Sequence, residues 1–281
     1  MCIRDRFFAA VCEWSAEVRG EVLVFQDGDW ERNKELLAAI KAATFDNLIL
    51  RGSLKEEIQS DLVQFFAARE TYERYRIPWK RGVLFTGPPG NGKTHTVKAL
   101  INQLQKPCLY VKGFKSEYAT DQENIALVFE RARMTTPCLL VLEDLDSMLD
   151  ETSRSLFLNE LDGFETNSGL VVLATTNHPE LLDPAIVERP SRFDRKYAFD
   201  SPGEQERLAY ISGWNRKLEP ELQICESITN QVVQVTEGFS FAYLKELFLS
   251  SMMQWMSQEM SMAEVMIDQA GRLRAQMEKT P

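Results

Sequence analysis

Apolar residues recur along this chain with two different periods. Short runs rich in apolar residues predict β-strands, and apolar residues spaced three or four apart predict helices between them. The runs predicted to be strands lie at 21–26, 82–86, 107–111, 138–142, 170–175 and 196–199. Strands that alternate with helices are typical of a mostly parallel sheet covered on both faces, so the pattern predicts an α/β fold.

The same pattern divides the chain into three parts. Residues 7–44, with a strand, a turn at "DGD" and a helix from about Trp30 to Ala42, are expected to be the end of a preceding domain and its linker, which gives a first part over 1–44. The α/β core is expected over 45–202. Beyond "DSPGEQER" only helical periodicity follows, which predicts a small α-helical domain over 203–281.

This last part ends in a predicted amphipathic helix over 251–279. Its apolar residues recur at spacings of three or four, which favours a packing face or a short coiled-coil seam over a client-binding groove. These residues are Met252, Met256, Met260, Ala263, Ile267, Ala270, Leu273 and Met277.

Composition narrows the class of protein. The formal net charge is −10, from 32 basic and 42 acidic residues, so we expect no nucleic-acid partner. The five cysteines fit no metal-binding spacing, and Cys108 and Cys138 fall in predicted strands, which favours reduced core thiols in an intracellular protein on the cytoplasmic side.

The amino-terminal end raises the question of a membrane anchor. No run is apolar for long enough to span a membrane, and no signal-peptide pattern is present. The opening "MCIRDR" joins poorly to the apolar residues after it and resembles a translated adapter, so residues 1–6 are expected not to be native. A membrane attachment is therefore expected only through a missing amino-terminal segment.

The stretch "RGVLFTGPPGNGKTHTVKAL" (81–100) carries the strongest motif. Gly87, Gly92, Lys93 and Thr94 fit G-x-x-x-x-G-K-[ST], directly between a predicted strand and a predicted helix. The glycines let backbone N–H groups curl around phosphates, Lys93 adds a point charge, and the Thr94 hydroxyl can bind Mg²⁺. The predicted phosphate-binding loop consists of Gly87, Pro88, Pro89, Gly90, Asn91, Gly92, Lys93, Thr94 and His95.

Polar residues end two further predicted strands. In "LLVLEDLDSM" (139–148), Glu143 and Asp144 provide one carboxylate for a metal and one for a nucleophilic water. The alternative is a capping cluster for the next helix, and Asp146 fits that interpretation alone. Asn177 ends "VVLATTN", where its amide can hold the attacking water or contact the γ-phosphate.

Three arginines follow in "ERPSRFDRKYAF" (188–199), at positions 189, 192 and 195. Arginines at this spacing in an acidic protein are commonly solvated or paired with acids. They are also what a neighbouring subunit needs to neutralise charge on a transferred phosphoryl group.

Together these segments carry a family resemblance. In order and spacing, "GPPGNGKT", "LLVLEDLD", "LFLNELDGF", "VVLATTN" and "LLDPAIVERPSRFDR" resemble the AAA ATPases of the AAA+ superfamily, from about Phe45 to Trp255. The lead-in "FFAARETYERYRIPWKRGVLFTGPPGNGKT" and the Glu-Asp order are most similar to the group related to the mitochondrial complex III assembly ATPase and its bacterial relatives. The resemblance implies an αβα P-loop core, a helical lid and a hexamer-like homo-oligomeric ring. It also implies Mg²⁺-dependent hydrolysis of ATP to ADP and phosphate.

The resemblance also implies roles for single residues. Glu143 corresponds to the metal-side acid, Asp144 to the water-activating acid and Asn177 to the first sensor. Arg192 and Arg195 correspond to arginines that act on a neighbouring subunit's nucleotide. "TEGFSFAYLKELF" (236–248) resembles the lid helix over the adenine, and "FDNLIL" (45–50) resembles the segment on its other side.

Two features depart from the family pattern. In the loop that grips polypeptides in such rings, Tyr118 and Ala119 fit, Thr120 replaces a glycine, and Phe114 is a rival aromatic residue. The Glu-Asp order also gives the catalytic acid a reach about 1.5 Å shorter than glutamate, one carbon–carbon bond.

The leading hypothesis is therefore ATP-driven, chaperone-like remodelling or translocation of an unidentified protein client. The alternative is a nucleotide-gated assembly scaffold that hydrolyses ATP very slowly. A clamp loader or helicase is disfavoured by the acidic balance.

Overall fold

The structure is a computed structural model that describes residues 22–163, 167–257 and 260–278. The expectation that residues 1–6 are not native lies outside this range. The chain forms two compact units, which are described separately. Of the described residues, one unit contains those within 22–47, 56–87 and 93–198, and the other contains those within 48–55, 88–92 and 199–278.

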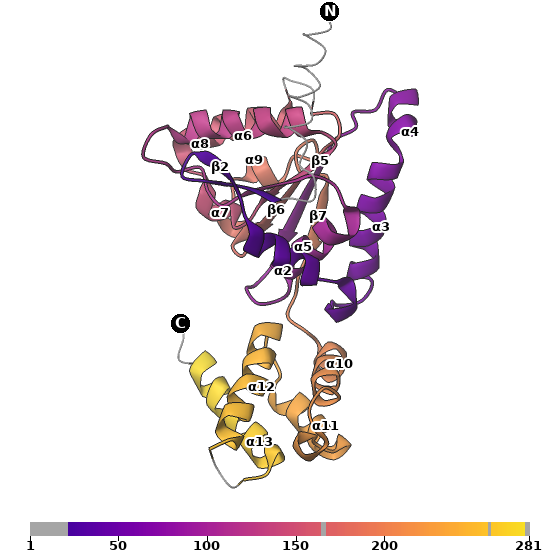
Figure 1. The fold of residues 1–281 in the computed structure, drawn as a ribbon, viewed down its shortest axis with the longest axis vertical. Coiled ribbons are helices and arrows are strands. Elements are labelled where there is room, and N and C mark those ends of the chain that lie inside the picture. Colours follow the sequence, from indigo (N-terminus) through magenta and orange to yellow (C-terminus); the bar gives the residue numbers. More distant parts are fainter. Residues whose placement is uncertain (1–21, 164–166, 258–259, 279–281) are drawn as a thin grey trace, which may run out of the picture. The chain divides into compact units, whose positions relative to one another are not determined.

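The first unit is built on a seven-stranded sheet in the order β2-β1-β4-β5-β6-β3-β7 (Figure 1). Every neighbouring pair is parallel except β1 and β2. The strands are β1 Val22–Gln26, β2 Asp29–Arg32, β3 Arg81–Thr86, β4 Cys108–Val111, β5 Cys138–Leu142, β6 Leu170–Thr176 and β7 Arg195–Ala198. The predicted α/β fold with a mostly parallel sheet is confirmed.

The strand β2 was not predicted, because residues from Trp30 were assigned to a helix. Asp27 and Gly28 both have positive φ, at 54° and 90°, and Gln26 pairs with Asp29, so they form a two-residue hairpin turn. The helix α2 (Lys34–Ala42) begins later, after Asn33, whose side chain accepts a hydrogen bond from Leu36 N.

The hairpin also corrects the predicted domain boundary at residue 44. Strand β1 pairs in parallel with β4 over Val22↔Cys108 to Phe25↔Val111, and Phe25 is fully buried. Residues 22–42 are therefore the edge of the core sheet and not the end of a separate preceding domain.

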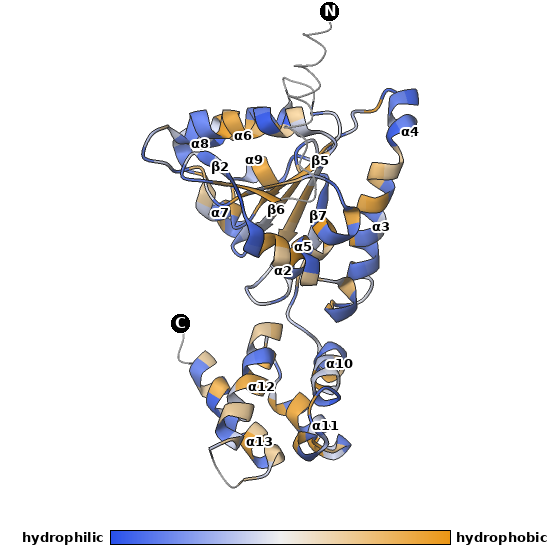
Figure 2. Ribbon diagram, in the orientation of Figure 1, coloured by the Kyte–Doolittle hydropathy of each residue, from blue (hydrophilic) through white to orange (hydrophobic). Residues whose placement is uncertain are grey.

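Helices cover both faces of this sheet, and its central strands are strongly apolar (Figure 2). On one face, Leu84, Leu109 and Leu140 pack with residues of α6 and α8, among them Phe129 and Phe157. On the other face, α5 packs against β6 and against α2. The helices of this unit after α2 are α3 Leu54–Ala67, α4 Arg69–Arg74, α5 Lys93–Leu104, α6 Asp121–Thr135, α7 Leu145–Met148, α8 Glu151–Asp162 and α9 Pro184–Val187.

The second unit is helical and has its own core. Its helices are α10 Glu204–Asn215, α11 Glu226–Val235, α12 Phe241–Trp255 and α13 Met262–Met277. Trp214 stacks on Phe248 with ring centroids 5.3 Å apart, inside a cluster that includes Leu244, Val232 and Met266.

The single amphipathic helix predicted over 251–279 is two helices. Ser261 and Glu264 form a capping box that starts α13, because each side chain bonds the other residue's backbone N–H. The predicted packing face is confirmed for Ala270 and Leu273, which are buried, whereas Met256 lies between the helices and is 72% exposed.

Candidate nucleotide-binding site

The phosphate loop connects the end of β3 at Thr86 to the start of α5 at Lys93. Gly87, Gly90 and Gly92 have φ of 132°, 80° and 95°, a region that favours glycine. These three residues therefore allow the tight curl of backbone N–H groups that the motif predicted.

Lys93 is the first residue of α5 and is 6% exposed. Its ammonium group donates a hydrogen bond to the Gly87 carbonyl. Burial lowers the pKa of Lys93, whereas the carboxylates of Asp144, Asp146 and Glu143 raise it. The lysine and the three strand-end acids thus form one charged cluster within the first unit.

The middle of the loop is held inside the second unit. Ala242 N donates to the Gly90 carbonyl at 3.1 Å, and a Cβ at Gly90 would lie 2.6 Å from the Ala242 Cβ. Asn91 is buried, with Nδ2 3.4 Å from the Phe199 carbonyl. Pro88 and Pro89 are exposed beside them.

His95, predicted as part of the loop, is the third residue of α5 and directly follows Thr94. Its Nε2 lies 3.2 Å from the Thr44 carbonyl oxygen, so the ring joins α5 to the segment after α2. Thr94 itself is exposed, which leaves its hydroxyl accessible at the helix start.

The strand-end acids and Asn177 meet at the carboxyl ends of β5 and β6. Asn177 Nδ2 donates to Asp144 Oδ1 at 3.0 Å, and Asp144 N donates to Thr175 Oγ1 at 3.1 Å. Asp144 adopts a left-handed conformation with φ 54° and ψ 53°, which aspartate tolerates better than most residues. The predicted water-activating acid and the predicted sensor are therefore in direct contact.

Asp146 has a different role from the helix cap that its position indicated. It lies in the first turn of α7, where no side chain caps the helix, and it accepts a hydrogen bond from Thr176 Oγ1 at 2.6 Å. The cluster of acids is therefore tied to β6 by both of its aspartates.

Glu143 lies deeper than the two aspartates. One carboxylate oxygen, Oε2, accepts a hydrogen bond from the Tyr110 hydroxyl, while Oε1 is buried and has no hydrogen-bond partner among the described residues. Burial raises the pKa of Glu143, whereas a hydrogen bond with the Thr94 side chain and the positive charge of Lys98, both on α5, lower it. A buried carboxylate oxygen, on a carboxylate that also interacts with the Thr94 hydroxyl, fits a Mg²⁺ ligand set.

The predicted trans-acting arginines lie away from this cluster. Arg195 is paired in register with Val83 near the amino end of β3, whereas the phosphate loop follows the carboxyl end of that strand. Arg192 is 6% exposed and forms a two-point ion pair with Asp162, at 3.0 Å from Nε and 2.6 Å from Nη2. Arg189 is exposed.

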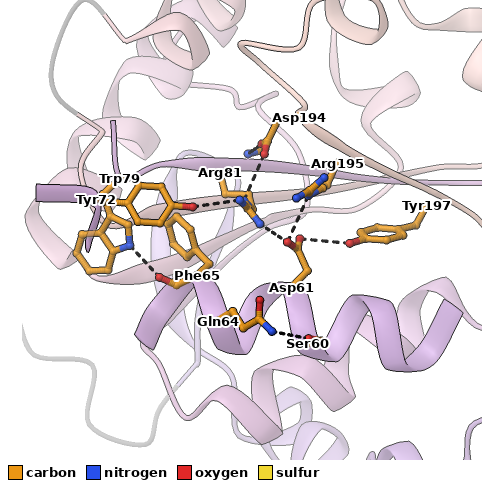
Figure 3. Close-up of polar contacts among 11 residues, drawn as sticks. Ser60, Asp61, Gln64, Phe65, Tyr72, Trp79, Arg81, Asp194, Arg195 and Tyr197 are labelled. Carbon is orange, nitrogen blue, oxygen red and sulfur yellow. Dashed lines mark hydrogen bonds and ion pairs between the residues drawn. The ribbon is translucent and has the colours of Figure 1, made fainter. Parts of the chain in front are cut away.

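Arg195 belongs to a polar network at the amino end of β3 (Figure 3). Its Nε lies 3.3 Å from Asp61 Oδ1, and Asp61 also pairs with Arg81 and accepts from Tyr197 at 3.2 Å. Burial and the Asp61 charge raise the pKa of Tyr197 to about 12. The side chain of Arg195 is half exposed, so it remains accessible from outside the chain.

The two rival aromatic residues of the client-gripping loop are clearly separated by burial. Phe114 is 1% exposed and packs against Phe157 with ring centroids 6.3 Å apart. Tyr118 is 92% exposed. Of the two, Tyr118 is the side chain available to a partner.

Four residues that contact the predicted site residues were not predicted from the sequence. Tyr110 and Thr175 contact the two acids, Asp162 pairs with Arg192, and Asp61 pairs with Arg195. Of these, Tyr110 and Thr175 carry a weak sequence signal, because both lie near the carboxyl ends of predicted strands, but the acids that they contact follow only from the order and register of the strands.

The fold and the phosphate loop define the first unit as a P-loop nucleotide-binding domain. Residues 83–201 match the family described as "ATPase family associated with various cellular activities (AAA)", and the chain therefore carries an AAA domain of the AAA+ ATPases.

Curated relatives agree with this assignment. The chain is similar to two proteins named ATP-dependent zinc metalloprotease FtsH. That of Acidothermus cellulolyticus is 34% identical over 213 residues, 69% of this chain and 31% of the relative. That of Acaryochloris marina is 33% identical over 224 residues, which are 73% of this chain and 33% of the relative. An uncharacterized AAA domain-containing protein of Schizosaccharomyces pombe is 33% identical over 191 residues, which are 63% of this chain and 24% of the relative. The chain spans about a third of the length of the FtsH relatives.

Among the described helices, none combines the length and the apolar character that a membrane crossing requires.

Proposed function

We propose that this protein hydrolyses ATP and couples the hydrolysis to remodelling of a protein client in an oligomeric ring. The observation that carries the proposal is the meeting of Lys93, Glu143, Asp144 and Asn177 at the carboxyl ends of the central strands. This is the edge of an open α/β sheet where ligands bind, beside a complete phosphate-loop motif.

Each of these residues has a defined task. Thr94 and Glu143 would hold Mg²⁺, which when bound neutralises negative charge on the phosphates. Lys93 contributes a positive charge to the outer phosphates, and Asp144 accepts a proton from the attacking water. Asn177 fixes the orientation of Asp144 through its 3.0 Å hydrogen bond.

The ring is proposed because the arginines need a second chain. Arg192 and Arg195 belong to the opposite end of β3 from the phosphate loop, so they act on a nucleotide only if that nucleotide is held by a neighbour. The Glu-Asp order of Glu143 and Asp144 supports the proposal that this chain is a member of the group related to the mitochondrial complex III assembly ATPase. The zinc protease activity in the names of the FtsH relatives belongs to those proteins, of which the chain matches about a third.

The proposal is tested by phosphate release from purified protein with ATP and Mg²⁺. We expect Lys93→Ala to abolish ATP binding and turnover, because the outer phosphates lose their point charge. Lys80→Ala is the matched control, since Lys80 donates to the carbonyls of Leu161 and Asp162 at the other end of the strand. Turnover in Lys93→Ala equal to that of the unmodified chain would refute the proposal.

A nucleotide-gated scaffold is the second candidate. Asp144 is one methylene shorter than glutamate, and its Oδ1 is already engaged by Asn177. Misplacement of a reacting group by about 1 Å can cost ~10²-fold in rate. Assembly on ATP with no measurable phosphate release would favour the scaffold over the remodelling enzyme.

A further inference from the structure

We propose that Tyr110 is a positioning residue that fixes the metal-side acid Glu143. The proposal rests on the proposed function, because it concerns the ATP-Mg²⁺ site. Tyr110 donates its hydroxyl to Glu143 Oε2 and leaves the buried Oε1 as the carboxylate oxygen that can bind the metal.

The sheet register explains why this side chain reaches Glu143. Tyr110 of β4 lies opposite Val141 of β5 in a parallel pair, so their side chains are on the same face. Glu143 follows two residues after Val141 and returns to that face. The phenol is long enough to reach diagonally to it, where a shorter side chain on β4 would end beside Val141.

Two side chains of α5 also interact with the Glu143 carboxylate. Thr94 and Lys98 lie one turn apart on α5, and both act on the Glu143 carboxylate. Tyr110 is 5% exposed, so its hydroxyl is removed from bulk water and has little alternative to the carboxylate. The Tyr110 phenol of β4 and two side chains of α5 thus act on one carboxylate.

The Glu-Asp order gives this contact its significance. A glutamate has one more rotatable bond than an aspartate, and holding its carboxylate in one place costs more side-chain entropy. Without Tyr110, the longer acid is free to turn toward the cations Lys93 or Lys98 instead of the metal position. A hydrogen bond to one oxygen removes that freedom, as outer partners of metal ligands commonly do.

The test is Tyr110→Phe in the full chain, which removes one hydroxyl and keeps the ring. Binding of a fluorescent, non-hydrolysable ATP analogue is titrated with Mg²⁺, and Mn²⁺ binding to the nucleotide complex is followed by electron paramagnetic resonance. We expect roughly 10- to 100-fold weaker metal affinity in the variant. Analogue affinity in chelator should change less than twofold, and the unfolding midpoint should stay near that of the unmodified chain.

Two further variants sharpen the result. Tyr210→Phe removes a partly buried hydroxyl in the second unit and should leave metal affinity unchanged. In Glu143→Gln, addition of Tyr110→Phe should produce no further loss, because the positioned carboxylate is already absent.

The outcomes separate the two proposals. If the unmodified chain binds the analogue with metal and Tyr110→Phe does so equally well, the Tyr110 inference is overturned and the proposed function stands. If the unmodified chain binds no analogue with or without metal, the proposed function itself is overturned. If Tyr110→Phe lowers metal affinity and the unfolding midpoint together, with the same loss in Glu143→Gln, the hydroxyl supports the fold and not the Glu143 carboxylate, and the inference is overturned.

Discussion

At the scale of single residues, the unusual feature of this site is the order of its two acids. The longer acid, Glu143, is half-buried beside Tyr110, with its Oε1 buried, and the shorter one, Asp144, lies exposed in a left-handed turn. Burial and exposure fit the two tasks, since a metal ligand benefits from being fixed and a water-activating acid must reach solvent.

We expect Asp144→Asn to lower turnover by about 10²-fold or more while ATP affinity stays nearly constant, because the general base is lost. Asparagine tolerates the left-handed backbone and keeps an oxygen for Asn177, so the substitution removes charge with little change in shape. The measurement is phosphate release under saturating ATP.

Asp150→Asn provides the matched control for this experiment. Asp150 also directly precedes a helix. It caps α8 by accepting from Thr152 N and Ser153 N, and asparagine caps equally well. An unchanged rate in Asp144→Asn would exclude Asp144 as the base and leave the scaffold as the better function.

At the scale of elements, Arg192 has a structural role. Its guanidinium joins the end of α8 at Asp162 to the α9 region through the Ala185 carbonyl. Gly82 is adjacent to the same segment, where a Cβ would lie 1.7 Å from the Arg192 carbonyl oxygen. The loop that carries the arginines is thus fixed against β3 by tight packing and by an ion pair.

We expect Arg192→Ala to lower the free energy of unfolding by about 2 kcal/mol, because the buried arginine makes charged hydrogen bonds whose loss leaves Asp162 unpaired. Chemical denaturation measures the change. Arg189→Ala is the control, since Arg189 is exposed and a surface change is worth less than about 0.5 kcal/mol. Equal stabilities of the two variants would contradict the structural role of Arg192.

The same ion pair predicts a dependence of stability on pH. Hydrogen bonds from Arg192 lower the pKa of Asp162, so the pair contributes stability above the pKa of an unfolded aspartate and loses it as pH falls through the lowered value. Asp162→Asn should therefore be less stable than the unmodified chain at pH 7, and the difference should shrink toward pH 3. A difference that grows on acidification would contradict this assignment.

The sequence allowed most elements of the first unit to be predicted, because parallel strands buried on both faces are continuous apolar runs. All five residues of β5 are buried, and its bounds match the prediction. Strand β2 was missed because three of residues 29–32 are charged and exposed, so this edge strand has no apolar pattern to detect.

Side-chain partners were predicted less well than elements for a related reason. The motif identified Lys93 and Thr94 through local spacing. Contacts such as Arg192 with Asp162 depend on which strand ends and helix ends meet in the fold. For strand residues such as Tyr110 and Val141, the neighbours follow from the register of the sheet. That register is not visible in a single sequence.

At the scale of the whole molecule, the proposed ring predicts that defects in two different chains can complement each other. A Lys93→Ala chain lacks a working phosphate loop but still presents Arg195. An Arg195→Ala chain has a working loop but lacks that arginine. Since Arg195 is half exposed and its contact with Asp61 is 3.3 Å long, its removal should disturb the fold less than removal of Arg192.

Mixing the two variants creates interfaces in which an intact loop faces an intact arginine. We therefore expect phosphate release by the mixture to exceed the sum of the separately measured variants and to rise with total protein concentration, because such sites exist only in mixed oligomers. Replacing the Lys93→Ala chain by one that carries both substitutions should abolish the gain, since no chain then supplies Arg195. A mixture whose rate equals the sum of its parts, under conditions where sedimentation detects oligomers, would show that Arg195 does not act on a neighbour's nucleotide.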